Sequence, residues 1–178
     1  LMSKIYYTGN FISTNKVDIL MANHINRLDF SIISSVVKQF TNKNIYTIIQ
    51  KDISRLPIVG NFTNGLLVID RIYEMDKEKI IKFIQSLDNC ILIIMPEGTR
   101  MDKKNLEISQ NFSKRHNLTK YNNILYPKMK GLDLIVNELN ENNKLGNLID
   151  LTIKVNDKFK LKTGYFDYLK TKMGNIFC

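Results

Sequence analysis

His24 and Asp29 are the two residues whose types and spacing best fit chemistry. Four residues separate them, and they lie between a hydrophobic run that ends at Ala22 and an amphipathic run that follows. This spacing lets an imidazole on a turn meet a carboxylate in the first turn of a helix. A carboxylate that accepts a hydrogen bond from one ring nitrogen leaves the other nitrogen free to take a proton from a hydroxyl group. The pattern therefore predicts a general base with its orienting acid.

The same spacing has a second interpretation, in which these residues only cap a helix. Asn26 is a good N-cap residue, and Asp29 then occupies the third helical position. A carboxylate there is stabilised by the positive end of the helix dipole. The pair alone does not decide between catalysis and capping, so the context in which it lies has to decide.

Three further segments carry residue types that suit an anionic ligand. Residues 96–100, Pro-Glu-Gly-Thr-Arg, follow another hydrophobic run. Lys51 and a stretch that ends in Arg71 come before them, and residues 125–131 combine Leu-Tyr-Pro with two lysines and a glycine. A guanidinium offers forked donors that match two phosphate oxygens, and glycine lets the backbone approach a ligand closely. Each segment alone also fits an ordinary turn or a surface charge.

In this order, the four segments resemble the motifs of the glycerolipid acyltransferase family, which includes the 1-acylglycerol-3-phosphate acyltransferases. Residues 23–29 are similar to the first motif, and residues 51–71 are similar to the second, which ends in a phosphate-binding arginine. Residues 96–100 are similar to the third motif and residues 125–131 to the fourth. Some details look most like the branch that contains lysocardiolipin acyltransferases, and these lie at residues 27–29, 130–131 and 150–153.

The resemblance implies transfer of a fatty acyl group from a coenzyme A thioester to the free hydroxyl of a lysophospholipid, with lysophosphatidate as the expected acceptor. His24 is then the base, and Asp29 stabilises the imidazolium that forms. Arg71 binds the phosphate of the acceptor, while Glu97 is expected to hold an arginine or the turn in place. The remaining residues expected to bind substrate are Lys51, Gly98, Thr99, Arg100 and Pro127. Lys128 and Lys130 are weaker candidates for phosphate contacts.

The chain departs from the family pattern at three positions near the motifs. Met101 stands where many members have serine, and Ile25 and Asn26 replace the glutamine and serine that are common in bacterial members. These departures remove no catalytic group, so they bear on the acceptor rather than on the reaction. Lysocardiolipin or another lysophospholipid is therefore the alternative acceptor. Because no Gly-x-Ser-x-Gly elbow is present, direct transfer without an acyl-enzyme is expected.

The composition fits one globular domain, residues 1–178, with its motif-bearing core near residues 17–155. A formal charge of +9 indicates an anionic partner. We expect acyl-coenzyme A and a lysophospholipid at the site and an anionic membrane surface beside it. No nucleic acid is expected, because the sequence has no recognised binding motif for it. A non-catalytic module that docks on anionic membranes fits the same charge and is the alternative from another class.

Two cysteines, Cys90 and Cys178, provide neither a disulfide framework nor a metal cluster. We expect no metal and no bound cofactor, with acyl-coenzyme A as a co-substrate, and a reducing compartment. No apolar run approaches the roughly 18 residues typical of a transmembrane helix. The first twenty residues also lack the apolar core of a signal peptide. The expected location is the cytoplasmic face of a membrane, with no transmembrane helix in this chain.

Hydrophobic periodicity predicts strands that alternate with helices. Strands are expected at residues 17–22, 44–50, 66–69, 91–95, 123–126 and 148–155. Helices are expected at residues 28–40, 76–88, 106–116 and 132–139, with a short helical turn at 51–56. This alternation implies an α/β fold with a largely parallel sheet and helices on both faces. Ligands bind outside the carboxyl ends of such strands, where His24, Lys51, Arg71 and Glu97 are expected to converge.

Overall fold

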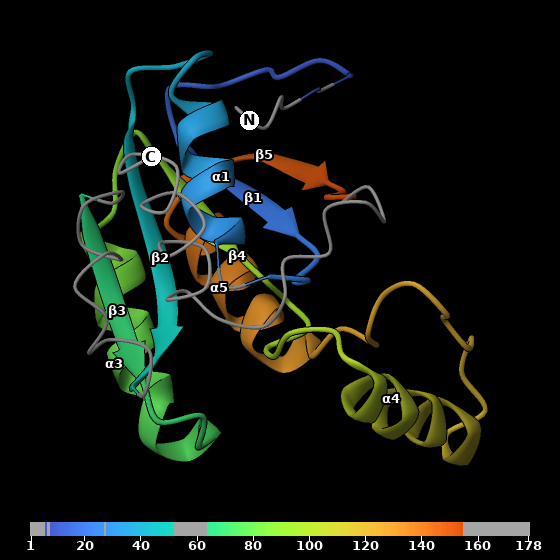
Figure 1. Cartoon of the computed structure of the whole chain (residues 1–178). Coiled ribbons are helices and arrows are strands. Elements are labelled where there is room, and N and C mark those ends of the chain that lie inside the picture. Colours follow the sequence, from blue (N-terminus) through green and yellow to red (C-terminus); the bar gives the residue numbers. More distant parts are fainter. Residues whose placement is uncertain (1–5, 7, 27, 52–63, 155–178) are drawn as a thin grey trace, which may run out of the picture.

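A five-stranded parallel sheet organises the protein (Figure 1). The computed structural model describes residues 6, 8–26, 28–51 and 64–154. The strands are β1 (Val17–Ala22), β2 (Asn44–Gln50), β3 (Gly65–Ile69), β4 (Cys90–Ile94) and β5 (Leu145–Leu151). Their order is β3-β2-β4-β1-β5, and every neighbouring pair is parallel. All five strands therefore end at one edge of the sheet, the carboxyl edge, and begin at the opposite amino edge.

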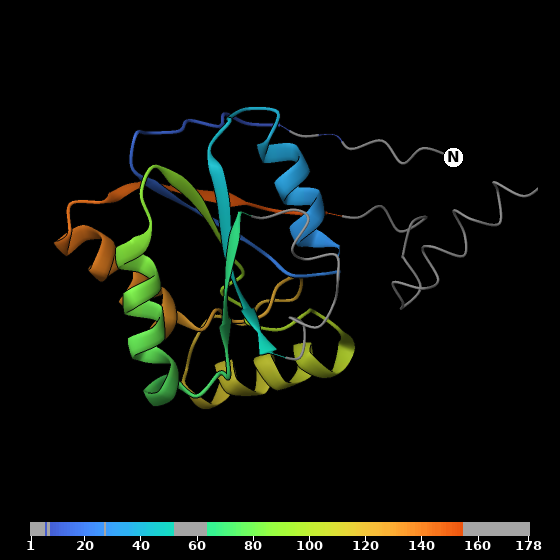
Figure 2. The ribbon, with the colours of Figure 1, turned by 90° about the vertical axis from the view of Figure 1, so that its left-hand side faces the viewer.

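Helices cover both faces of the sheet, as predicted. Helix α1 (Asp29–Val37) lies on one face, and α3 (Tyr73–Ser86) and α5 (Met129–Glu141) pack together on the other (Figure 2). Helix α4 (Lys103–Arg115) lies off the sheet, on the side toward which the strand arrows point in both views. None of the helices in the described part of the chain is long and apolar enough to cross a bilayer.

Two hydrophobic cores explain why the central strands are apolar almost throughout. Val17 and Ile19 of β1 pack toward α3 and α5, whereas Leu20 and Ala22 pack toward α1. A parallel strand that is buried on both faces needs apolar residues at successive positions rather than at every second one. The three helices that cover the sheet bury one apolar stripe each: Ile80 and Ile84 of α3, Ile33 and Val37 of α1, and Leu132, Ile135 and Leu139 of α5.

The strand predicted at residues 123–126 is wrong. These residues form an irregular connection between α4 and α5. Leu125 is buried, and the backbone N–H of Tyr126 donates to Ser109 Oγ of α4 at 2.7 Å. The short apolar run at residues 123–126 resembles a strand in composition. The Tyr126 N–H, however, bonds to a side chain of a helix instead of to a neighbouring strand.

Several element boundaries also differ from the prediction. The helix predicted at 28–40 ends at Val37, so Phe40 is 43% exposed and its ring lies 5.6 Å from that of Phe11. The helix predicted at 106–116 begins earlier, because Asp102 accepts a hydrogen bond from the N–H of Asn105 and acts as an N-cap. The last strand runs over Leu145–Leu151 rather than 148–155. Residues 52–56 of the predicted helical turn lie outside the described residues.

Candidate active site

His24 and Asp29 meet at the carboxyl edge of the sheet. His24 follows β1 on a loop, and Asp29 is the first residue of α1. The Nδ1 atom of His24 is 3.0 Å from Oδ2 of Asp29. The Asp29 side chain is fully buried, whereas 15% of the His24 side chain is exposed. An ionised carboxylate can only accept, so in the neutral imidazole this contact assigns the hydrogen to Nδ1 and the lone pair to Nε2.

The capping interpretation of this segment is only partly right. Helix α1 begins at Asp29, and Leu28 in the N-cap position makes no side-chain cap. Asn26 is therefore not the N-cap, and its Oδ1 accepts from the N–H of Leu28 at 3.1 Å. The Asp29 Oδ2 atom accepts from the N–H groups of Ile25 and Asn26, each at 2.7 Å. One carboxylate oxygen thus holds both the loop and the imidazole.

The loop that carries His24 is tied to two other segments by the Asn23 side chain and by the His24 carbonyl. Asn23 Oδ1 accepts from the N–H of Ile153 at 2.6 Å, and Asn23 Nδ2 donates to the carbonyl of Ile153 at 3.0 Å. The carbonyl of His24 accepts from the N–H of Met101 at 2.7 Å. These bonds link the loop after β1 to the chain beyond β5 and to the loop after β4, so the imidazole is placed from several directions.

Arg71, Gly98 and Lys128 form a second group at the carboxyl edge. A β-carbon placed on Gly98 would lie 3.4 Å from Arg71 Nη2 and 3.7 Å from Lys128 Nζ. Both Gly98 and Arg71 have a φ of +66°, which is strained for an arginine and ordinary for a glycine. Burial, and then the charge of Arg71, lower the pKa of Lys128. An anion bound beside Gly98 would stabilise the positive charges of Arg71 and Lys128.

Glu97 links these two groups from a buried position. Only 5% of it is exposed, and burial raises its pKa to about 7. Hydrogen bonds from the backbone of Leu125 and of His24 lower the pKa, while the charge of Asp29 raises it further. Glu97 was predicted to hold an arginine or the turn. The contacts place it against the His24 turn and against the segment that precedes Lys128.

The remaining residues of the predicted site lie around this centre. Thr99 and Arg100 are half-buried on the loop between β4 and α4, and the Arg100 carbonyl accepts from Asn105 Nδ2 at 2.9 Å. Pro127 is half-buried beside Lys128, whose N–H donates to the carbonyl of Pro96 at 2.9 Å and joins the third motif to the fourth. Lys51 is 67% exposed and pairs with Asp70 at 3.5 Å, so its phosphate contact stays a prediction.

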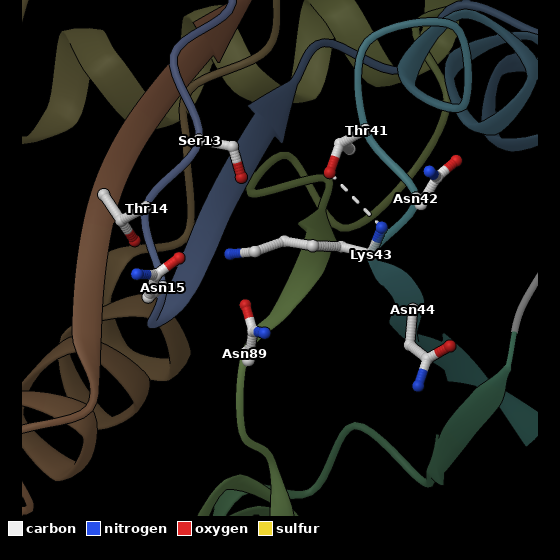
Figure 3. Close-up of a pocket in the computed structure, with 8 residues that line it drawn as sticks. All are labelled: Ser13, Thr14, Asn15, Thr41, Asn42, Lys43, Asn44 and Asn89. Carbon is white, nitrogen blue, oxygen red and sulfur yellow. Dashed lines mark hydrogen bonds between the residues drawn. The ribbon is translucent and has the colours of Figure 1, made fainter.

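A cavity of about 510 Å³ lies at the other end of the sheet (Figure 3). Its lining is polar and comes from the segments that precede β1, β2 and β4: Ser13, Thr14, Asn15, Thr41, Asn42, Lys43, Asn44 and Asn89. The Lys43 ammonium lies 2.9 Å from Asp18 Oδ2, so its charge is neutralised within the fold. This cavity is therefore poorly suited to binding an anion.

Two other kinds of site receive no support from the described residues. The Cys90 thiol is buried, and burial raises its pKa to about 11, so it is not an activated nucleophile. Within the described ranges, no three His, Cys, Asp or Glu side chains converge to hold a metal ion.

Comparison with known families decides the relationship of this chain. A family model described as Acyltransferase matches residues 4–144, which include His24, Arg71 and Gly98. The chain belongs to the acyltransferase family. The resemblance to glycerolipid acyltransferases seen in the motifs is thereby confirmed, as is the α/β fold with a parallel sheet.

Curated acyltransferases resemble the chain at low identity. Lysocardiolipin acyltransferase 1 of Mus musculus is 24% identical over 159 residues, covering 84% of this chain and 42% of that protein. The Gallus gallus protein of the same name is also 24% identical and covers 85% and 42%. Probable 1-acyl-sn-glycerol-3-phosphate acyltransferase 5 of Arabidopsis thaliana is 23% identical, covering 77% and 38%. The chain thus spans about two fifths of these relatives. No solved structure shows a significant match.

Two residues of the candidate site had little or no part in the sequence prediction. Asn23 was recognised as part of a motif but given no role. Its side-chain amide bonds to the backbone of Ile153 and so fixes the start of the loop that carries His24. Lys128 was a weak candidate, because a lysine on a basic chain is an ordinary observation. The signal that could have raised it was its place directly after Pro127, in the loop that follows α4 and returns to the carboxyl edge.

Proposed function

We propose that this chain is the catalytic domain of an enzyme that transfers a fatty acyl group from acyl-coenzyme A to the free hydroxyl of lysophosphatidate, giving phosphatidate. The observation that carries the proposal is the 3.0 Å contact between His24 Nδ1 and Asp29 Oδ2. It leaves Nε2 as the basic atom of a partly exposed imidazole. Residues 97–101 join this pair to the group formed by Arg71, Gly98 and Lys128.

In the proposed reaction, the acceptor hydroxyl oxygen attacks the carbonyl carbon of the thioester. His24 Nε2 removes the hydroxyl proton as the new C–O bond forms, and Asp29 stabilises the imidazolium through Nδ1–H. The C–S bond then breaks, and the departing thiolate takes the proton back from the imidazolium. The products are an acylated phospholipid and free coenzyme A, and His24 returns to its neutral form.

The acceptor's phosphate is proposed to lie between Arg71 and Lys128, above Gly98. A phosphate dianion relieves the repulsion between two adjacent cations and accepts charge-assisted hydrogen bonds from both. The absence of a side chain at Gly98 leaves space for that approach, because a β-carbon would stand 3.4 Å from each cationic side chain. A lipid acceptor also supports a location at a membrane surface, and we propose its cytoplasmic face.

A second candidate acceptor is lysocardiolipin, which also carries phosphate groups. The names of the mouse and chicken relatives favour it, since both are lysocardiolipin acyltransferases. The chemistry at His24 is the same for either acceptor. Only the part of the lipid beyond the phosphate differs.

The direct test is to incubate the whole chain with radiolabelled oleoyl-coenzyme A and one acceptor at a time, and then to separate the lipid products. The acceptors are lysophosphatidate, lysocardiolipin and lysophosphatidylcholine, whose phosphate carries a bulky choline. We expect labelled phosphatidate as the main product, and labelled cardiolipin if the second candidate is right. A folded protein that labels none of these lipids contradicts both candidates.

A further inference from the structure

Helix α4 turns its polar side toward the protein. Ser113 is its only buried residue, and Ser113 Oγ donates to the carbonyl of Ser109. Ser109 Oγ accepts from the backbone of Tyr126, and Gln110 Nε2 donates to the carbonyl of Tyr121 at 2.9 Å. A helix of a soluble domain usually presents its apolar stripe to the core and its polar side to water. Helix α4 largely reverses that arrangement.

The outward side of α4 carries large apolar residues. Ile108 is 56% exposed and Phe112 is 45% exposed, and they lie one helical turn apart. The Phe112 ring lies 5.6 Å from the ring of Tyr126, which in turn lies 6.1 Å from that of Tyr121. Tyr121 is itself 36% exposed. The exposed apolar area therefore continues from the helix into the loop that follows it.

Cationic side chains flank this apolar area. Lys104 lies one turn before Ile108, and Arg115 lies one turn after Phe112, both exposed. Residues 100–130 as a whole carry eight lysines and arginines against two acidic residues, Asp102 and Glu107. Most of the +9 net charge of the chain therefore comes from this stretch. We call Lys104, Ile108, Phe112, Arg115 and Tyr121 the α4 surface.

The α4 surface lies beside the candidate active site. Helix α4 begins three residues after Arg100, and the N–H of Met101 donates to the carbonyl of His24. Figures 1 and 2 both show α4 on the side of the carboxyl edge. Other exposed apolar residues lie at this edge too. Ile72 and Met75 follow β3, at and within the start of α3, and Met129 is the first residue of α5.

We propose that the α4 surface docks the domain on an anionic lipid surface. Ile108 and Phe112 enter the boundary between headgroups and acyl chains, where apolar side chains with flanking cations are stabilised. Lys104 and Arg115 stay at the level of the anionic headgroups. The occupant is a lipid surface rather than a protein, because the apolar area is bordered by cations that match anionic headgroups. The inference rests on the proposed function only in supposing that the bound membrane supplies the acceptor.

Vesicle binding tests the proposal without any turnover. The whole chain is sedimented with vesicles of phosphatidylcholine alone or of phosphatidylcholine with phosphatidylglycerol, in the absence of acyl-coenzyme A and lysophospholipid. The test variant is Ile108→Asn with Phe112→Ser, and its matched control is Leu148→Asn, because Leu148 of β5 is 52% exposed. A charge variant, Lys104→Gln with Arg115→Gln, is matched by Lys77→Gln with Lys82→Gln on the exposed side of α3.

We expect wild type and Leu148→Asn to bind the anionic vesicles equally, and the Ile108/Phe112 variant to lose about tenfold or more in partition coefficient. The Lys104/Arg115 variant should lose about fivefold per residue, and only on anionic vesicles. Wild-type binding by a folded Ile108/Phe112 variant overturns the proposal. So does a large fall in its melting temperature, because that result shows Ile108 and Phe112 packed against protein. Neither result bears on acyl transfer, which is measured separately in detergent micelles.

Discussion

The two edges of the sheet each bury an aspartate, and the two carboxylates are used in different ways. Asp18 at the amino edge accepts on both oxygens: Ser13, the Thr14 N–H and Lys43 donate to Oδ2, and the Thr14 hydroxyl and the Asn147 N–H donate to Oδ1. Asp29 at the carboxyl edge accepts three hydrogen bonds on Oδ2, and its buried Oδ1 has no partner among the described residues. The hydrogen bonds of Asp18 hold the fold together, whereas Oδ1 of Asp29 keeps acceptor capacity that the described residues do not use.

The carboxyl edge shows the same pattern at other residues. Glu97 Oε2 is buried without a hydrogen-bond partner in the described part of the chain, Arg71 has a positive φ, and Lys128 lies near a like charge. Strained or incompletely paired groups persist where another requirement maintains them, and they cluster at functional sites. The cavity of about 510 Å³ lies at the amino edge, but its lysine is neutralised. Among the described residues, buried polar atoms without a partner therefore distinguish the candidate active site from the amino edge.

The largest expected effect is that of Asp29→Asn on the reaction. An amide at this position favours the wrong tautomer of His24 and no longer stabilises the imidazolium, so we expect kcat/KM for acyl transfer to fall by about 10³ to 10⁴. Steady-state thiol release measures it. The matched variant at the other edge, Asp18→Asn, should keep near wild-type kcat/KM per folded molecule. Equal losses from the two variants would remove the distinction between the edges.

Stability should respond in the opposite order. Burial would raise the pKa of Asp18, but hydrogen bonds from Asn147, Thr14 and Lys43 outweigh it and lower the pKa to about 2. Asp18→Asn leaves the Lys43 charge without its carboxylate, so we expect a loss of about 3 kcal/mol in the free energy of unfolding. Urea unfolding measures this loss. A smaller destabilisation by Asp18→Asn than by Asp29→Asn contradicts the structural role assigned to the amino edge.

The two edges should also differ in the pH dependence of stability. The lowered pKa of Asp18 gives a stabilisation that is present above about pH 4 and is lost as the pH falls toward 2. The pKa of Glu97 is raised from 4.5 to about 7, so its contribution is present below about pH 4.5 and is lost as the pH rises through 7. As the pH rises from about 4.5 to 8, the free energy of unfolding of wild type should therefore fall by about 2 to 3 kcal/mol relative to that of Glu97→Gln.

Urea titrations of wild type and Glu97→Gln at several pH values measure that difference. The Glu78→Gln variant, at an exposed position on α3, serves as the control and should show no comparable change. Parallel stability curves for wild type and Glu97→Gln across this range would show that the Glu97 carboxyl is not held in its protonated form by burial.

The smallest expected effect concerns acceptor binding. Lys128→Met removes one of the two cations beside Gly98, and we expect the KM for lysophosphatidate to rise about tenfold with little change for acyl-coenzyme A. Lys82→Met is the matched control, because Lys82 is exposed on α3 and is not among the residues expected to bind substrate. The same rise in KM for an acceptor that lacks a phosphate would show that Lys128 does not act on that group.

The sequence predicted the parts of the molecule that depend on local pattern. The apolar run of β1 predicted a strand buried on both faces. Because the strands were expected to be parallel, the segments after β1, β3 and β4 were expected at one edge of the sheet, where the structure has them. Tertiary contacts decided the rest. The hydrogen bonds of Asn23 with Ile153 join residues 130 positions apart. Lys128 lies beside Gly98 at the end of an irregular loop that stands where a strand was expected, at 123–126. Neither contact leaves a periodic signal in the sequence.

The proposed acyl transfer at the carboxyl edge requires His24 as its base. Its most direct test is thiol release from oleoyl-coenzyme A with lysophosphatidate in detergent micelles, for wild type, His24→Ala and His116→Ala. We expect release that depends on the acceptor, falls by about 10³ to 10⁴ in His24→Ala, as in Asp29→Asn, and is retained in His116→Ala, the chain's other histidine. Release by a folded His24→Ala variant at the wild-type rate would contradict it.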